Sequence, residues 1–239
     1  MLTKPFDIRY DELDTHAHIG PVTLLRYFQE AAALDAASFA FGWEQLQEKN
    51  LAWVLTHMQL EMLGEPAPKQ TVSARTWHAF SDKLLSRREF EFTDQDGKPL
   101  ARGASWWALI DVTKRRLTKS PAELLALNPA EPQFITQEEN FKRALPPNAP
   151  QTGEAVIYVR REDLDLNGHV NNTHYAAWAL EAVPEGKRLH KLLIHFKNEC
   201  RAGDVITSAA YAENEQILHH RLIRQSDGKE AAHAITFWH

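Results

Sequence analysis

Residues 160–184 read RREDLDLNGHVNNTHYAAWALEAVP and pass from a strand-like start through a polar turn into a helical pattern. The apolar residues after the turn recur at helical spacing and form one face: Tyr175, Trp178, Ala179 and Ala182. Asn171 and Asn172 stand where this helix should begin, which is a favoured place for asparagine. The stretch therefore predicts a strand, a turn and a helix in succession.

The chain repeats this stretch near its start. Residues 8–32, IRYDELDTHAHIGPVTLLRYFQEAA, align with residues 159–183, VRREDLDLNGHVNNTHYAAWALEAV. Further along, residues 94–107, DQDGKPLARGASWW, align with residues 225–238, QSDGKEAAHAITFW. Both ends of a unit of roughly 100 residues recur, which predicts two diverged copies of one domain.

Each copy shows one helix followed by several strand-like runs, and the first helix is expected over residues 22–41. This order is typical of an α+β unit in which an antiparallel sheet wraps around its helix. We place an N-terminal domain at 1–128, a proline-rich linker at 129–153 and a C-terminal domain at 154–239. The two domains are expected to pair as a pseudo-dimer.

Composition narrows the functional classes. The 239 residues carry a net charge of −5, which gives no support to nucleic-acid binding. The single cysteine excludes an intrachain disulfide. The first residues lack the apolar core of a signal peptide, and no uncharged apolar run approaches the ~18 residues of a membrane helix. We expect a soluble, cytoplasmic protein without membrane insertion.

The polar turn of the second copy is the candidate active site. Asp165, Asn167 and His169 alternate along it, so in extended backbone their side chains would point the same way. A carboxylate, an amide and an imidazole would then meet at the start of a helix. The twelve histidines of the chain do not combine with cysteines or carboxylates at metal-binding spacing, so no metal is predicted.

The motif D-L-N-G-H-V-N-N-x-x-Y-x-x-W at residues 165–178 resembles that of hotdog-fold thioesterases. The closer resemblance is to acyl-ACP thioesterases, which are two hotdog domains in one chain. QEAAALDAASFAFGW at 29–43, KRRLTKSP at 114–121 and Glu199-Cys200-Arg201 fit the same family. The resemblance implies hydrolysis of acyl-ACP to free fatty acid without a cofactor, by a monomer or homodimer. Plant members carry a transit peptide that is not seen here, so a bacterial-type member is implied.

Carried over from the family, the catalytic residues are Asp165, Asn167, His169 and Glu199, with Cys200 as an alternative nucleophile. Adjacent residues of a regular strand point to opposite faces. We therefore favour Glu199 and interpret Cys200 as a core residue. A carboxylate, Asp165 or Glu199, would act as general base, or Asp165 would attack the thioester directly; the sequence leaves both open.

Two further groups complete the predicted site. The backbone N–H groups of Val170 and Asn171, at the helix start, are natural donors to an oxyanion. Arg115, Arg116 and Lys119 form a basic cluster on an acidic protein. This cluster is either a solvated hairpin edge or a docking point for acidic ACP.

The first copy keeps part of the motif. Asp14, His18 and Glu61 match Asp165, His169 and Glu199, whereas His16 replaces Asn167. We interpret the first copy as the acyl-binding half, and a second, weaker site there stays open.

Three rival functions remain. A hotdog acyl-CoA thioesterase shares the D-x-x-G-H-V-N-N core. A hydratase or dehydratase of the same fold typically shows D-x-N-P-x-H, in which Asp and His are differently spaced. A non-catalytic acyl-binding module would have no need of the acid–amide–imidazole set.

Overall fold

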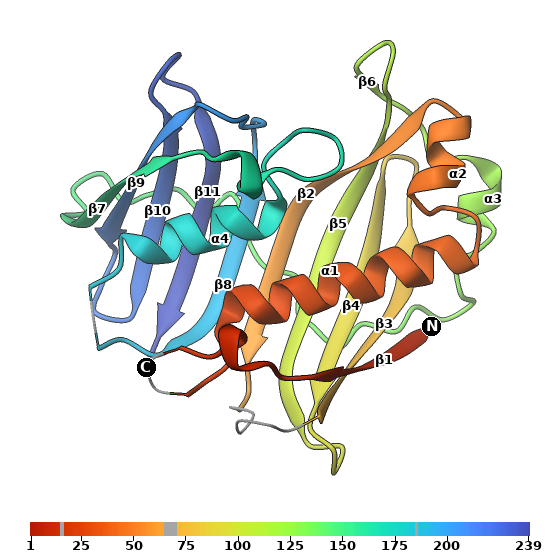
Figure 1. The fold of residues 1–239 in the computed structure, drawn as a ribbon, viewed down its shortest axis with the longest axis horizontal. Helices are drawn as coiled ribbons and strands as arrows, with labels where there is room; N and C mark the ends of the chain where they lie inside the picture. The colour runs from red at the N-terminus through yellow and green to blue at the C-terminus, as the bar shows by residue number, and fades with distance from the viewer. Residues whose placement is uncertain (15–16, 65–70, 185) are drawn as a thin grey trace. The chain divides into compact units, whose positions relative to one another are not determined.

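Both copies of the strand–turn–helix stretch form in the computed structural model, which describes residues 1–14, 17–64, 71–184 and 186–239 (Figure 1). The chain divides into two units, residues 1–138 and 139–239. Each unit combines an antiparallel sheet with one long helix, which confirms the predicted α+β class. None of the helices in the described part of the chain is long and apolar enough to span a membrane.

The first unit consists of β1 (Leu2–Asp7), the 3-10 turn η1 (Tyr10–Glu12), α1 (Pro21–Ser38), α2 (Trp43–Glu48), β2 (Leu51–Met62), β3 (Thr71–Ser81), β4 (Leu85–Thr93), β5 (Pro99–Asp111), β6 (Arg116–Leu117) and α3 (Ala122–Leu125). The strand order is β1-β3-β4-β5-β2, with β6 paired to β5. Figure 1 shows α1 lying across one face of these strands.

Aromatic packing holds α1 on its sheet. Phe28 is fully buried and stacks on Phe90 of β4, with ring centroids 4.6 Å apart. A Cβ on Gly103 would come within 3.0 Å of the Phe28 ring and 2.8 Å of the Gln59 carbonyl oxygen. Glycine at this position of β5 therefore allows the helix to approach the strand closely.

The second unit consists of β7 (Gln151–Tyr158), the 3-10 turn η2 (Arg161–Asp163), α4 (Asn172–Glu181), β8 (Leu189–Phe196), β9 (Val205–Ala212), β10 (Ile217–Arg224) and β11 (Glu230–Trp238). Its strand order, β7-β9-β10-β11-β8, repeats that of the first unit element by element. Shared topology is what two copies of one domain would give, in agreement with the internal repeat.

The predicted apolar face of the second helix is buried as expected: Tyr175, Trp178, Ala179 and Ala182. Close packing continues at the helix end, because a Cβ on Gly153 of β7 would collide with the Ala182 carbonyl oxygen. Gly153 lies inside the predicted linker, whose last three residues overlap the start of β7.

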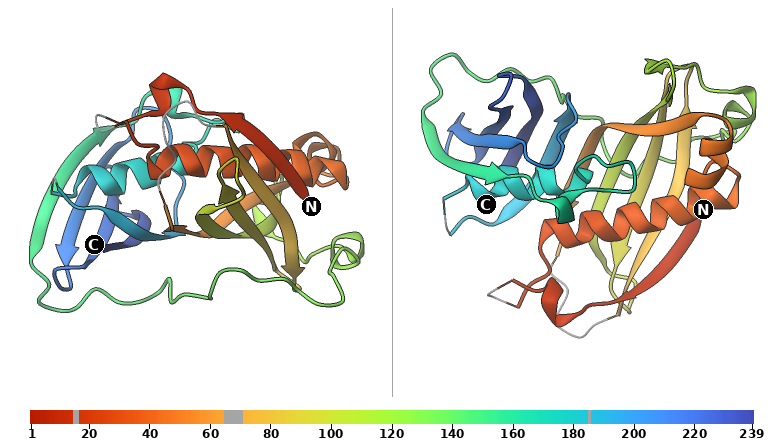
Figure 2. Two further views of the ribbon diagram at one scale, coloured as in Figure 1. Left: turned by 90° about the horizontal axis from the view of Figure 1, so that it is seen from below. Right: turned by 45° about the horizontal axis from the view of Figure 1, so that its top comes forward.

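The segment between α3 and β7 contains no helix or strand among its described residues. Its first part lies on the sheet face opposite α1, as the left view of Figure 2 shows. The buried Glu89 carboxylate accepts the Thr136 N–H at 3.1 Å, and the Trp77 indole N–H donates to the Gln133 carbonyl oxygen at 3.0 Å. These bonds attach residues 133–136 to the first unit.

Candidate active site

The polar turn of the second unit is closed by its own backbone. Leu164 and Val170 form an antiparallel bridge, and the Asp165 N–H donates to the His169 carbonyl oxygen at 2.7 Å. Gly168 has a φ of +74°, which the turn needs in order to reverse. The expectation of extended backbone with three side chains on one face is therefore wrong, because the chain folds back between residues 165 and 169.

Asp165 shapes this turn. Its Oδ1 accepts the N–H of Asn167 at 2.8 Å and the N–H of His169 at 3.2 Å. An aspartate whose side chain accepts the backbone N–H two residues later forms an Asx turn. This turn fixes the backbone, and with it the directions in which the following side chains point. Asn167 is exposed at the tip, and His169 is half-buried at the end of the turn.

Asn171 caps α4, since its Oδ1 accepts the Thr173 N–H at 3.0 Å. The Val170 N–H donates to the Cys200 carbonyl oxygen, and the Asn171 N–H to the Asp163 carbonyl oxygen, both at 2.9 Å. The prediction that these two N–H groups bind an oxyanion is wrong, because both already have acceptors. The Val170 bond instead ties the turn to the segment that carries Glu199.

Glu199 and Cys200 lie in the loop between β8 and β9, because β8 ends at Phe196. The expectation that both belong to a regular strand is wrong. The loop nevertheless directs them to opposite sides: the Glu199 side chain is 45% exposed, whereas Cys200 is fully buried.

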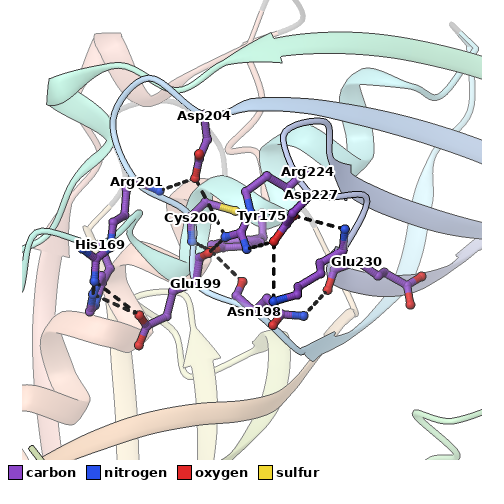
Figure 3. Close-up of polar contacts among 11 residues, drawn as sticks. His169, Tyr175, Asn198, Glu199, Cys200, Arg201, Asp204, Arg224, Asp227 and Glu230 are labelled. Atoms are coloured by element: carbon purple, nitrogen blue, oxygen red, sulfur yellow. Dashed lines mark hydrogen bonds and ion pairs between the residues drawn. The ribbon is translucent and has the colours of Figure 1, made fainter. Parts of the chain in front are cut away.

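The central contact of the site joins the turn to this loop. The His169 Nε2 lies 3.1 Å from the Glu199 Oε2, as Figure 3 shows. Arg201, the third residue of the Glu199-Cys200-Arg201 motif, places its Nη2 3.3 Å from the same imidazole nitrogen and 3.9 Å from the Glu199 Oε2. The sequence gives no signal for this contact. The geometry thus assembles an acid–imidazole pair with an arginine beside it, open to solvent.

Cys200 belongs to the interior. Its N–H donates to the Tyr175 hydroxyl oxygen at 3.0 Å, and its sulfur points toward Tyr175 and away from His169 (Figure 3). Burial raises the pKa of the Cys200 thiol, which keeps it protonated. A buried, protonated thiol without an imidazole beside it is a poor nucleophile, so this placement disfavours the thiol mechanism.

The first unit contains a turn with the same hydrogen bonds between its aspartate and its histidine backbone. The Asp14 Oδ1 accepts the His18 N–H at 2.9 Å, and the Asp14 N–H donates to the His18 carbonyl oxygen at 2.9 Å. Glu61, however, lies inside β2, paired with Arg102, whereas its counterpart Glu199 lies in a loop beyond its strand. His16 lies outside the described residues.

The predicted basic cluster lies in the first unit, away from the turn at residues 164–170 in the sequence. Arg115, Arg116 and Lys119 are exposed at the end of β5 and around β6, in the first unit. Among the residues that the structure describes, no group of three or more histidines, cysteines or carboxylates could hold a metal ion.

Two successive domains of identical topology, with an acid–imidazole pair in the second, define a tandem hotdog protein. Comparison with known families narrows the class: the acyl-ACP thioesterase N-terminal domain matches residues 1–127, and the C-terminal domain of the same family matches residues 148–239. The chain belongs to the acyl-ACP thioesterase family.

Individual relatives agree. An acyl-[acyl-carrier-protein] hydrolase of Cuphea viscosissima, described as chloroplastic, is 30% identical over 98% of this chain and 61% of its own length. A chloroplastic oleoyl-acyl carrier protein thioesterase of Arabidopsis thaliana is 26% identical over 98% of this chain and 75% of its own. The chain therefore spans about three fifths of the length of the first of these curated relatives.

Solved structures show the same fold. An acyl-ACP thioesterase from Bacteroides thetaiotaomicron superposes with a TM-score of 0.86 at 22% identity, covering 99% of this chain and 97% of the other. A 12:0-ACP thioesterase from Umbellularia californica gives 0.85 at 23% identity, covering 100% and 96%. These likenesses confirm the predicted double hotdog fold.

Proposed function

We propose that the chain hydrolyses the thioester of acyl-ACP and releases free fatty acid and ACP. The observation that carries the proposal is the contact of His169 Nε2 with Glu199 Oε2, located in the matched C-terminal family domain. Membership of the family supports ACP as the carrier of the acyl chain.

Glu199 is the base in this proposal, and His169 is its partner. The Asp165 Oδ1 already accepts two backbone N–H groups and holds the turn, so we assign Asp165 to shaping the site. Glu199, exposed to solvent beside an imidazole, would accept a proton from water as that water attacks the thioester carbonyl. His169 would orient the carboxylate and the water.

The departing group needs little help, because an alkyl thiol has a pKa near ~8.5 and leaves readily as thiolate. The negative charge that develops on the carbonyl oxygen needs hydrogen-bond donors. The N–H of Asn172, the first residue of α4, has no acceptor among the described residues, and it lies at the positive end of the helix dipole. We assign it, together with the Asn167 amide at the turn tip, to oxyanion stabilisation, where one such donor can contribute ~3 kcal/mol.

The test is hydrolysis of a medium-chain and a long-chain acyl-ACP by the purified chain, with the matching acyl-CoA esters assayed side by side. The proposal predicts release of fatty acid from acyl-ACP at a higher kcat/KM than from acyl-CoA. A double variant, His169→Ala with Glu199→Ala, controls for contaminating thioesterases and should be inactive. Hydrolysis of acyl-CoA but not of acyl-ACP would contradict the proposal and identify the chain as an acyl-CoA thioesterase. Binding of acyl-ACP without hydrolysis would contradict the proposal and identify the chain as a non-catalytic acyl-binding module.

A further inference from the structure

We propose that Arg224, held by Asp227, is a positioning residue that acts together with Tyr175 to aim the Glu199 carboxylate at His169. The inference rests on the proposed function, since it assigns a role within the same site. Arg224 ends β10, and Asp227 lies in the turn between β10 and β11, so both come from outside the segments singled out as catalytic. Figure 3 shows the two side chains on the far side of the loop from His169.

The peptide group that joins Glu199 to Cys200 is held at both ends. Its carbonyl oxygen accepts a hydrogen bond from the Arg224 Nη1, and its N–H donates to the Tyr175 hydroxyl oxygen at 3.0 Å. A peptide plane fixed through both its oxygen and its hydrogen cannot rotate freely. The direction in which the Glu199 side chain leaves the backbone is thereby set.

Arg224 is itself fixed by a two-point bond. Its Nε lies 3.0 Å from the Asp227 Oδ1 and its Nη2 lies 2.7 Å from the Asp227 Oδ2, which is the bidentate geometry that arginine and carboxylates favour. These bonds lower the pKa of Asp227, so the carboxylate stays charged wherever the site works. Asp227 therefore accepts hydrogen bonds from two nitrogens of the guanidinium, and the third nitrogen, Nη1, donates to the Glu199 carbonyl oxygen.

The loop is anchored on its other flanks as well. The Asp204 Oδ2 accepts the Arg201 N–H at 2.8 Å, and the Asn198 side-chain amide donates to the Glu230 carbonyl oxygen at 2.8 Å. The Asp204 Oδ2 also lies 4.0 Å from the Arg224 Nη1, so of these two bonds only that of Asn198 is independent of Arg224, and we expect it to hold the loop when Arg224 is changed. The loss of the Arg224 bond should then release the peptide between residues 199 and 200 without unfolding the loop.

Misplacing a catalytic group by about 1 Å can cost ~100-fold in rate. We therefore expect Arg224→Met to lower kcat for acyl-ACP by about 10- to 100-fold while KM changes by less than about 2-fold. Arg224→Lys keeps a cationic donor group but loses the two-point bond to Asp227, and its kcat should fall between those of wild type and Arg224→Met. Arg221→Met is the matched control: Arg221 lies in the same strand and pairs with Glu230 at 3.1 Å, so its loss should leave kcat unchanged.

A double-variant cycle separates positioning from general support of the fold. Glu199→Ala keeps the backbone carbonyl that Arg224 binds but removes the carboxylate. If Arg224 acts through that carboxylate, Arg224→Met should cost nothing further in the Glu199→Ala background. An equal loss in both backgrounds, or wild-type activity in either single variant, would overturn the proposal.

If Glu199→Ala has no measurable rate, the single variants decide whether Arg224 is a positioning residue. The proposal then predicts that kcat falls from wild type to Arg224→Lys to Arg224→Met while KM stays constant. A change confined to KM, or Arg224→Lys as slow as Arg224→Met, contradicts positioning. The proposed function is judged separately, because it stands or falls with the wild-type rate on acyl-ACP.

Discussion

The turn that begins at Asp14, whose residues 15–16 lie outside the described part of the chain, and the turn that begins at Asp165 share two backbone hydrogen bonds and lead into different helix starts. In both, an aspartate Oδ1 accepts the N–H of the histidine four residues later, and the flanking residues form a bridge. They differ at the helix that follows: Asn171 caps α4 through its side chain, whereas Gly20 begins α1 without a side-chain bond. They differ again in the carboxylate, since Glu199 lies in a loop facing His169 and Glu61 lies within a strand.

The comparison teaches that the aspartate of this motif serves the fold first. The Asp14 and Asp165 carboxylates each organise a turn, whether or not catalysis follows. What the second copy adds is a shorter strand, β8, whose end at Phe196 releases the loop that brings Glu199 to the imidazole. The proposed site is therefore defined by the loop as much as by the motif.

The largest expected difference between the copies lies in the two histidines. His169→Ala should lower kcat for acyl-ACP by about 10³-fold, because it removes the partner of the base. His18→Ala should change kcat by less than about 3-fold. Steady-state hydrolysis at saturating acyl-ACP measures both, and comparable losses in the two variants would mean that both copies work.

Acidification should lower the stability of the second unit, because it contains a buried histidine that resists protonation. Burial lowers the pKa of His220 to about 3, and its Nε2 lies 2.8 Å from the Thr236 hydroxyl. Because the folded pKa is below the unfolded value of ~6.5, the unfolded chain binds more protons, and stability present above pH 6.5 is lost as the pH falls toward 3.

Between pH 7 and pH 5 this histidine should cost about 2 kcal/mol in the free energy of unfolding. Urea unfolding at the two pH values measures the loss, and His220→Gln, which does not titrate, should reduce it by that amount. An unchanged pH dependence in His220→Gln would assign the loss to other groups.

The residue with positive φ in the turn is glycine in the second copy and alanine in the first. Exchanging the two residue types should therefore change the stability in opposite directions. Gly168 has a φ of +74°, and Ala17 occupies the equivalent place with a φ of +60°. Gly168→Ala should destabilise by about 1 kcal/mol, and Ala17→Gly should stabilise by a similar amount, because a Cβ is strained in this region. Thermal unfolding of both variants checks the pair, and destabilisation by Ala17→Gly would contradict the shared geometry.

The smallest effect concerns the helix caps. Asn171→Ala removes the bond to the Thr173 N–H and should cost about 1 kcal/mol. Gly20→Asn supplies the missing cap to α1, where an added Cβ meets nothing within 4 Å, and should gain a few tenths of a kcal/mol. Equal and negligible effects in denaturant unfolding would show that the caps do not distinguish the copies.

Much of the fold could be predicted because the repeat and the helical spacing are local signals. The apolar face of α4 is an example, since its spacing alone placed Trp178 and Ala179 in the core. The site was harder to predict. No local signal in the sequence shows that β8 stops at Phe196, so the sequence predicts a strand at Glu199.

Non-local hydrogen bonds account for the remaining errors. The Val170 N–H was expected to be available because it lies at a helix start, but its acceptor, the Cys200 carbonyl oxygen, comes from a distant loop. The bond from Arg224 to the Glu199 carbonyl oxygen is equally invisible in the sequence, because it joins a strand end to a loop through the backbone. Such contacts depend on tertiary structure and have no periodic signal.

The most direct test of the account is the rate of acyl-ACP hydrolysis by Glu199→Gln and Glu61→Gln, each nearly isosteric with the residue it replaces. If the carboxylate facing His169 is the base, Glu199→Gln should lower kcat by about 100- to 1000-fold while Glu61→Gln stays within about 3-fold of wild type. Full activity in Glu199→Gln, or an equal loss in both variants, would contradict the assignment of catalysis to the second copy.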